Sequence, residues 1–275
     1  MTIMSNKKTE PNKIDISNLY KQFGQNVVLN NFNLAIKNGE SLCLIGTSGC
    51  GKSVALKCLI GLIHADSGSI KVDGQETLGQ SRSEHENLLN RFGMTFQFGA
   101  LFDSLPIWEN VTFRLRQKEK LNRKIAREIA GDIIDQLGLA PRVLDLYPAE
   151  LSGGMQKRAA IARAIADKPE ILLFDEPTSG LDPITSGVIN DLILNSVKRL
   201  GATTLTISHD MASVRQIADK VAMIHHGSII WCGPVADMHQ TGIPEVDQFV
   251  NGRPYGPLTS TAPKIEKTAP SEIIN

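Results

Sequence analysis

The sequence has few cysteines and no excess of either charge, and each of these shortages excludes a class of protein. Its 275 residues include only four cysteines, which lack the paired spacing of a metal site and suit a reducing cytosol. Basic and acidic residues number 29 each. This balance argues against a dedicated nucleic-acid binder, because such a protein would be expected to carry a strong basic excess.

Long hydrophobic stretches are also missing. Apolar runs such as Ile171–Phe174 are far shorter than the roughly 20 residues that span a bilayer. The opening segment, MTIMSNKKTEPNK, holds no apolar core, so no secretory signal is expected there. We therefore expect a cytosolic protein, or one held by a partner at the cytosolic face of a membrane.

The sequence does contain short apolar segments that alternate with helical patterns. Strands followed by helices imply parallel pairing through crossovers, so we expect an α/β fold with one main core. A helix is predicted over Lys52–Ile63, and the pattern is helical from Ile107 to about Lys168. Strands are predicted over Ile14–Leu19, Val27–Ile36, Ser41–Gly46, Gly68–Gly74 and Phe92–Gln97, and within EILLFDEP, TTLTISHD and VAMIHHGSIIWCG. The tail past Arg253 is rich in Pro, Thr, Ser and Lys and is expected to be poorly ordered.

A phosphate-binding pattern lies between the third predicted strand and the first predicted helix. GTSGCGKS reads G-x-x-x-x-G-K-S, in which glycines let backbone N–H groups turn towards phosphate oxygens. The start of the following helix adds partial positive charge. We expect Lys52 to neutralise phosphates and the Ser53 hydroxyl to hold Mg²⁺. The residues predicted to bind the nucleotide here are Gly46, Thr47, Ser48, Gly49, Cys50, Gly51, Lys52, Ser53 and Val54.

Two carboxylates follow another apolar run, in ILLFDEP. At the end of a buried strand, Asp175 would lie beside the metal ion, and Glu176 would orient or deprotonate a water molecule. Alone this pattern is weak, because acidic residues often cap strand ends. A phosphate loop on a neighbouring strand makes it much more specific.

The segment ELSGGMQKRAAIARAIADKPEILLFDEPTSGLD resembles the ABC-transporter ATPase family over its full length. LSGGM matches the family's signature motif and SGLD its D-loop. Gln97 matches the glutamine that contacts the metal and the hydrolysis site, and His209 the histidine that contacts the γ-phosphate. Phe23 matches the aromatic residue that stacks on adenine, with Tyr20 as a possible substitute. His209 could instead be an ordinary strand-end histidine, and Asp182 of SGLD is also a good helix N-cap.

The resemblance covers about residues 14–245 and implies a P-loop NTPase fold. Such a fold has a RecA-like core, an antiparallel β subdomain and a helical subdomain, here about 107–168. Residues 246–275 would be a partly disordered C-terminal extension. In the family, Ser152, Gly153 and Gly154 would close over ATP bound by the other subunit, with Asp182 nearby, so a homodimer that hydrolyses ATP is implied. Most members have Thr where this chain has Val54, which removes one side-chain hydroxyl near phosphate.

FQFGALFDSLPIWENV is apolar, and in ABC transporters the corresponding segment lines a groove that grips a coupling helix of the membrane subunit. An exposed apolar segment of this kind is typical of a partner-binding surface. Any of these side chains could instead fill the core of the helical region. The expected anchors are Phe98, Leu101, Phe102, Leu105 and Trp108, with Arg114 and Arg116 at the rim.

The same segment, together with GKSV, resembles the Mla/Mce-type lipid-transport ATPases. That resemblance implies an integral-membrane permease, an Mce-domain substrate-binding protein and, in some members, a STAS-domain subunit. The ATPase would sit at the cytoplasmic face of the inner membrane, and phospholipid or another lipid would move between inner and outer membranes. Transport of another solute is the alternative within the class. ABC ATPases of DNA repair or translation are disfavoured, because this chain has neither a coiled-coil insertion nor two ATPase halves.

Overall fold

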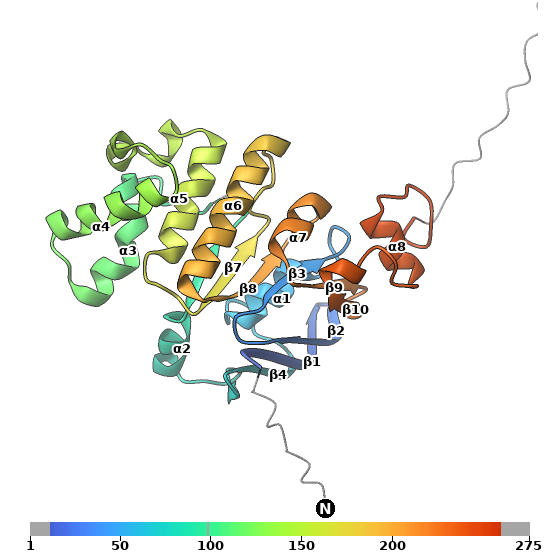
Figure 1. Cartoon of the computed structure of the whole chain (residues 1–275). Coiled ribbons are helices and arrows are strands. Elements are labelled where there is room, and N and C mark those ends of the chain that lie inside the picture. Colours follow the sequence, from blue (N-terminus) through green and yellow to red (C-terminus); the bar gives the residue numbers. More distant parts are fainter. Residues whose placement is uncertain (1–11, 98, 260–275) are drawn as a thin grey trace, which may run out of the picture.

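The computed structural model describes residues 12–97 and 99–259 and builds them around two β-sheets (Figure 1). The larger, six-stranded sheet has the order β10-β9-β3-β8-β7-β6. All its pairs are parallel except β9 with β10. Its strands are β3 (Ser41–Ile45), β6 (Phe92–Thr95), β7 (Ile171–Asp175), β8 (Thr203–Ile207), β9 (Lys220–His225) and β10 (Ser228–Pro234).

The smaller sheet is antiparallel and has the order β2-β1-β4-β5. Its strands are β1 (Ile14–Phe23), β2 (Asn26–Ile36), β4 (Ser67–Val72) and β5 (Gln75–Glu76). One apolar cluster joins this sheet to α1 (Lys52–Leu59) and to β3, with Phe32, Leu44 and Leu56 fully buried in it. The two sheets therefore share a core, and α1 lies between them.

The remaining helices cover the large sheet or pack together beyond its β6 edge (Figure 1). In the part of the chain that the structure describes, no helix is both long and apolar enough to cross a membrane. The helices are α2 (Arg82–Leu89), α3 (Ile107–Glu119), α4 (Arg123–Gln136), α5 (Gly153–Ile165), α6 (Pro183–Leu200), α7 (Met211–Ile217) and α8 (Pro244–Val250). Short 3-10 turns lie at Pro141–Asp145, Pro148–Glu150 and Val235–Asp237.

The predicted α/β fold is confirmed, with differences in detail. The helix expected over Lys52–Ile63 ends at Leu59. The strand expected to reach Gln97 ends at Thr95, and α2 was not predicted at all. A capping box begins α2, because the Ser81 hydroxyl accepts from Glu84 N and the Glu84 carboxylate accepts from Ser81 N at 2.9 Å. The helical span around 107–168 consists of three α-helices and two 3-10 turns, and its status as a separate subdomain stays a prediction.

The tail past Arg253 was expected to be poorly ordered, and the structure differs. The buried side chain of Gln248 accepts from Leu258 N at 2.8 Å and donates to the Thr259 hydroxyl at 3.2 Å. A buried amide must satisfy its donors and acceptor, and here the following turn supplies the partners. The prediction is therefore wrong up to Thr259, and residues 260–275 lie outside the described part.

The parallel strands bring the predicted site together. Because β3, β6, β7 and β8 all point the same way, their carboxyl ends lie at one edge of the sheet. The phosphate loop follows β3, and Glu176 follows β7. His209 comes shortly after β8, as Gln97 does after β6. Four segments far apart in the sequence thus meet at one edge.

Candidate active site

A cavity of about 660 Å³ lies at this edge of the sheet, around the loop that follows β3. Phe23 and all residues predicted in the phosphate loop except Cys50 line it, together with the three predicted catalytic residues. Asp175 and Cys50 lie beside it rather than on its wall. The lining residues are Phe23, Val28, Gly46, Thr47, Ser48, Gly49, Gly51, Lys52, Ser53, Val54, Gln97, Glu176, Ile207, His209 and Phe249.

Two glycines of the loop are required by the space around them. A Cβ on Gly46 would lie 2.4 Å from the Ile224 carbonyl oxygen, and one on Gly51 would lie 2.8 Å from the Val28 oxygen. Gly51 also has a φ of 110°, which an L side chain rarely adopts. The backbone can therefore take its tight path only because these positions lack side chains.

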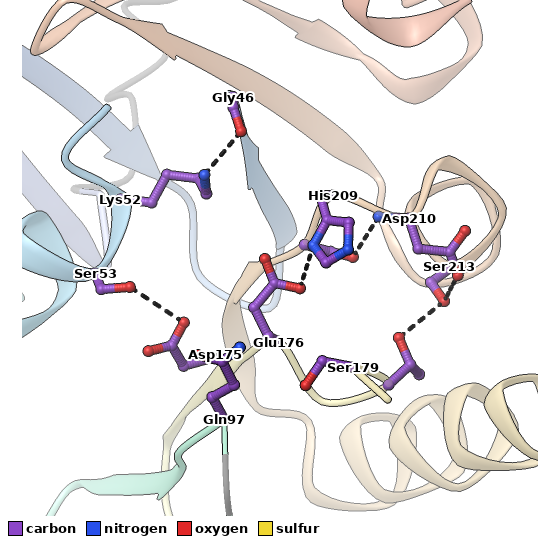
Figure 2. A network of polar contacts seen from close by, with 12 residues as sticks. Gly46, Lys52, Ser53, Gln97, Asp175, Glu176, Ser179, His209, Asp210 and Ser213 are labelled. Atoms are coloured by element: carbon purple, nitrogen blue, oxygen red, sulfur yellow. Dashed lines mark hydrogen bonds and ion pairs between the residues drawn. The ribbon is translucent and has the colours of Figure 1, made fainter. Parts of the chain in front are cut away.

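The start of α1 is suited to an anion. Gly51 caps the helix without any side-chain hydrogen bond, and the first turn holds no acidic residue. The first backbone N–H groups of a helix have no partner within the helix and carry its positive end. The Lys52 ammonium lies over the loop, where it donates to the oxygens of Gly46 at 2.7 Å and Thr47 at 2.9 Å (Figure 2). The Cys50 sulfur lies 3.8 Å from the same ammonium.

Oxygen ligands for a divalent cation lie next to the loop. The Ser53 hydroxyl is 3.5 Å from an Asp175 carboxylate oxygen (Figure 2). Burial raises the pKa of Asp175, and the charge of Glu176 adds to that rise. A hydroxyl beside a buried carboxylate fits the hard oxygen ligands that Mg²⁺ prefers, and Mg²⁺ bound with phosphates usually takes one or two carboxylates. Accordingly, the described residues hold no group of three or more His, Cys, Asp or Glu side chains arranged for a metal.

Glu176 is held in an uncommon conformation beside His209. Its carboxylate lies 2.7 Å from Nδ1 of His209, and its side chain is 14% exposed against 65% for the histidine. Its φ is 51°, in the left-handed region that non-glycine residues seldom occupy. Its N–H donates to the Ile207 oxygen at 3.0 Å, which anchors it to β8. The constrained backbone thus holds the Glu176 carboxylate at the wall of the cavity.

The signature motif begins α5 but does not face this cavity. The Ser152 hydroxyl caps α5 by accepting from Met155 N at 3.4 Å. Ser152, Gly153 and Gly154 line a second cavity of about 530 Å³, together with Asp182. The two cavities have no lining residue in common. The structure thus keeps these residues apart from the phosphate loop of the same chain.

Asp182 has the N-cap role expected of it. Its carboxylate accepts from Ile184 N and Thr185 N, both at 3.0 Å, at the start of α6. Phe23 lies at the mouth of the first cavity, with the Lys21 ammonium 5.1 Å from its ring centre. Tyr20, the possible substitute, is not among the residues lining the cavity. Phe23 is therefore the better placed aromatic residue.

Phe249 and Lys157 are among the residues in this region that were not predicted from the sequence. Phe249 of α8 lines the first cavity, although it lies far from Phe23 in the sequence. Lys157 of α5 donates to the Glu176 oxygen at 3.2 Å and to the Ser179 hydroxyl at 3.3 Å. Burial lowers the pKa of Lys157, although nearby carboxylates oppose that change. Lys157 lies in the segment that resembles the ABC family but was assigned no role there, and Phe249 belongs to no local motif, so only their positions in the fold reveal these contacts.

An apolar groove of about 760 Å³ lies away from the active site, between β6, α2 and α3. We call it the apolar groove. Phe102 lines it, is 42% exposed and lies with its ring centre 4.6 Å from that of Phe113. Asn110 fixes this segment, since its amide accepts from Phe102 N at 2.7 Å and donates to the Leu105 oxygen at 2.8 Å. The residues that line the groove include Phe92, Met94, Phe96, Phe102, Phe113 and Arg114.

Several expected anchors do not line the apolar groove. Trp108 is 1% exposed and belongs to the core between α3, α4 and α5, so its prediction as an anchor was wrong. Leu101 packs against the same core, and Leu105 does not line the groove. Arg114 lines it as predicted, whereas Arg116 binds Glu109 and lies over the Trp108 ring. Phe98 lies outside the described residues.

The chain is similar to known proteins over most of its length. A family model described as "ABC transporter" matches residues 29–179. The probable ribonucleotide transport ATP-binding protein mkl of Mycobacterium leprae is 37% identical, over 94% of this chain and 74% of that protein. The intermembrane phospholipid transport system ATP-binding protein MlaF of Haemophilus influenzae is 38% identical, over 90% and 93% respectively.

A similar solved structure is the dimeric post-hydrolysis state of the ATP-binding cassette MJ0796 bound to ADP and Pi. It has a TM-score of 0.74 and 29% sequence identity, and the match covers 81% of this chain and 98% of that one. These similarities agree with the phosphate loop, the strand-end carboxylates and the signature segment described above. The chain therefore belongs to the ABC transporter ATPase family.

Proposed function

We propose that this transport ATPase energises the movement of phospholipid, or a closely related lipid, between two membranes. The observation that carries the proposal is the similarity to MlaF of Haemophilus influenzae, which extends over nearly the full length of both chains. The resemblance of the FQFGALFDS segment to the Mla/Mce-type lipid-transport ATPases adds support. Ribonucleotide transport, which the name of the mkl relative suggests, is the second candidate.

Within the site, Lys52 and the N–H groups at the start of α1 would bind the phosphates of ATP. The aromatic ring of Phe23 would stack on the base. Ser53, Asp175 and Gln97 would hold Mg²⁺, which neutralises charge on the β- and γ-phosphates. Glu176 would accept the proton of the attacking water molecule, and His209 would orient that carboxylate from 2.7 Å.

A second copy of the chain would complete the site. The hydroxyl of Ser152 and the N–H groups of Gly153 and Gly154 can bind an anion, but they line a different cavity from Lys52. The dimeric state of the MJ0796 cassette supports pairing of two copies. A homodimer would therefore bury each ATP between the phosphate loop of one copy and the signature segment of the other.

The apolar groove would bind a coupling helix of an integral-membrane permease. It is lined by exposed and half-buried aromatic residues, and helices with apolar faces bind in such grooves. The protein would thus lie at the cytoplasmic face of the inner membrane through the permease. An Mce-domain substrate-binding protein, and in some assemblies a STAS-domain subunit, would complete the transporter.

The Phe102→Glu variant should lose transport while keeping ATP binding. A carboxylate at this position would have to lose its water when the coupling helix binds, and pairing with Arg163, whose guanidinium lies 5.9 Å from the Phe102 ring, would offset only part of that cost. The measurement is transport by the reconstituted complex beside nucleotide binding by the same preparation. Ile125→Glu is the matched control, since Ile125 is 43% exposed on α4 and does not line the groove. Loss of nucleotide binding in Phe102→Glu would show that the residue is ordinary core.

The cargo is tested by mass spectrometry of the purified complex. We expect phospholipid to co-purify with the ATPase and its permease in excess over a detergent-matched preparation of an unrelated membrane protein. The enrichment should disappear when the substrate-binding subunit is absent. If a ribonucleotide stimulates ATP hydrolysis by the complex and no lipid is enriched in it, the lipid proposal is overturned in favour of the second candidate.

A further inference from the structure

Lys157 occupies a junction of three functional segments. It lies on α5, two residues after the LSGGM signature motif, and its side chain is half-buried. The ammonium donates to the backbone oxygen of Gln97, to the backbone oxygen of Glu176 and to the hydroxyl of Ser179. An ammonium has three N–H donors, and here all three find acceptors.

These contacts hold the segment that carries the proposed base. The N–H of Glu176 donates to the Ile207 oxygen at 3.0 Å, and its C=O accepts from both Lys157 and Ser179 N at 3.2 Å. Both backbone groups of the residue are thus fixed, on opposite sides, by different elements. Glu176 has a φ of 51°, and a residue in this region needs surrounding contacts to stay there.

Lys157 also connects Glu176 to the segments that carry Gln97 and Ser179. Gln97 lines the nucleotide cavity, and Ser179 begins the SGLD segment that leads to Asp182. The same helix carries Ser152 at its N-cap. A movement of α5 relative to β7 would therefore change the contact between Lys157 and the Glu176 backbone.

We propose that Lys157 is a positioning residue for Glu176. Lys157 sets the direction of the Glu176 carboxylate and links it to the end of α5 that carries the signature motif. The inference rests on the proposed role of Glu176 as the base. Lys157 does not line the nucleotide cavity, and its contacts are with backbone oxygens and the Ser179 hydroxyl.

The test compares Lys157→Met with the wild-type chain in its transporter complex. Because a misplaced catalytic group costs rate rather than substrate affinity, kcat for ATP should fall about 10- to 100-fold while KM changes little. Lys157→Arg should recover part of kcat, since a guanidinium can still donate to the same oxygens. Lys71→Met is the control, since Lys71 is an exposed lysine on β4 that lines neither cavity, and its kcat should stay near the wild-type value.

A double variant separates positioning from general loss of structure. In a Glu176→Gln background, Lys157→Met should cause no further fall in the residual single-turnover rate, because the group it positions is already absent. A further fall of the same size as in the wild-type background would overturn the inference. So would unchanged kcat in Lys157→Met when Glu176→Gln is inactive. Wild-type turnover in Glu176→Gln alone would instead remove the proposed base and leave Lys157 without this role.

If Lys157→Met lowers the melting temperature strongly, Lys157→Gln provides the second variant. A glutamine can still donate two hydrogen bonds but cannot supply the charge or reach of the ammonium. A fall in kcat with unchanged KM and near wild-type melting temperature would support the inference. A fall in kcat that follows only the melting temperature across the three variants would overturn it.

Discussion

The Glu176→Gln variant should bind ATP with near wild-type affinity and hydrolyse it at least about 100-fold more slowly. The amide has the shape of the carboxylate but cannot accept the proton of the attacking water molecule. The carboxylate is largely buried, lies 2.7 Å from His209 and lines the nucleotide cavity, so the variant removes a proton acceptor that the site presents to the cavity. The measurement is phosphate release by the assembled transporter, beside binding of a fluorescent ATP analogue.

Glu109→Gln provides the control for the loss of one carboxylate. Glu109 pairs with Arg116 on α3, and it does not line the nucleotide cavity. Its turnover should remain near the wild-type value. If Glu176→Gln hydrolysed ATP at the wild-type rate, the base would have to be another group and the Lys157 inference would lose its basis.

The Lys52→Ala variant should lose most of its affinity for ATP. The ammonium is the main side-chain cation that the loop brings to the cavity, and hydrogen bonds to charged groups contribute about 1.5–3 kcal/mol. At 1.4 kcal/mol per factor of ten, the dissociation constant should rise roughly 10- to 100-fold. Equilibrium binding of a fluorescent nucleotide measures the change directly.

Removal of Lys52 also releases the loop oxygens that it now binds, so folding must be checked. Lys71→Ala is the control, since Lys71 is an exposed lysine on β4 away from the cavity. Both variants should show cooperative unfolding near the wild-type temperature. An unchanged dissociation constant in folded Lys52→Ala would mean that backbone N–H groups alone hold the phosphates.

The sequence predicted the nucleotide cavity well because its residues lie in short local patterns at strand ends. The steric need for glycine at positions 46 and 51 appears in the sequence itself as the pattern G-x-x-x-x-G. The apolar run before Asp175 predicts a buried strand, and parallel pairing places its end beside the loop. The assigned roles of these residues stay predictions until variants are measured.

Contacts between distant segments could not be predicted in this way. Lys157 binds groups 60, 19 and 22 residues away, so no local spacing indicates its role. The prediction of Trp108 as an anchor rested on its place in the apolar segment that lines the coupling groove in ABC transporters, but Trp108 packs in the core with α4 and α5. The guanidinium groups of Arg116 and Arg123 lie 5.2 and 5.4 Å from its ring, which the sequence alone does not reveal.

Helix α2 was missed for a different reason. Among its residues only Leu88 is buried, so the segment lacks the apolar periodicity on which helix prediction depends. Its signal is the capping box formed by Ser81 and Glu84, which is local and readable. Attention to capping residues would have found this helix, whereas hydrophobic pattern could not.

The separation of the two cavities has a consequence for reaction order. If a competent site requires the phosphate loop of one copy and the signature segment of another, the rate of hydrolysis by free subunits should vary with the square of their concentration when pairing is weak. Tethering two copies to one permease would raise their effective concentration and make the rate first order in complex. The permease would then act as a scaffold that sets how often ATP is consumed, in addition to receiving the resulting motion.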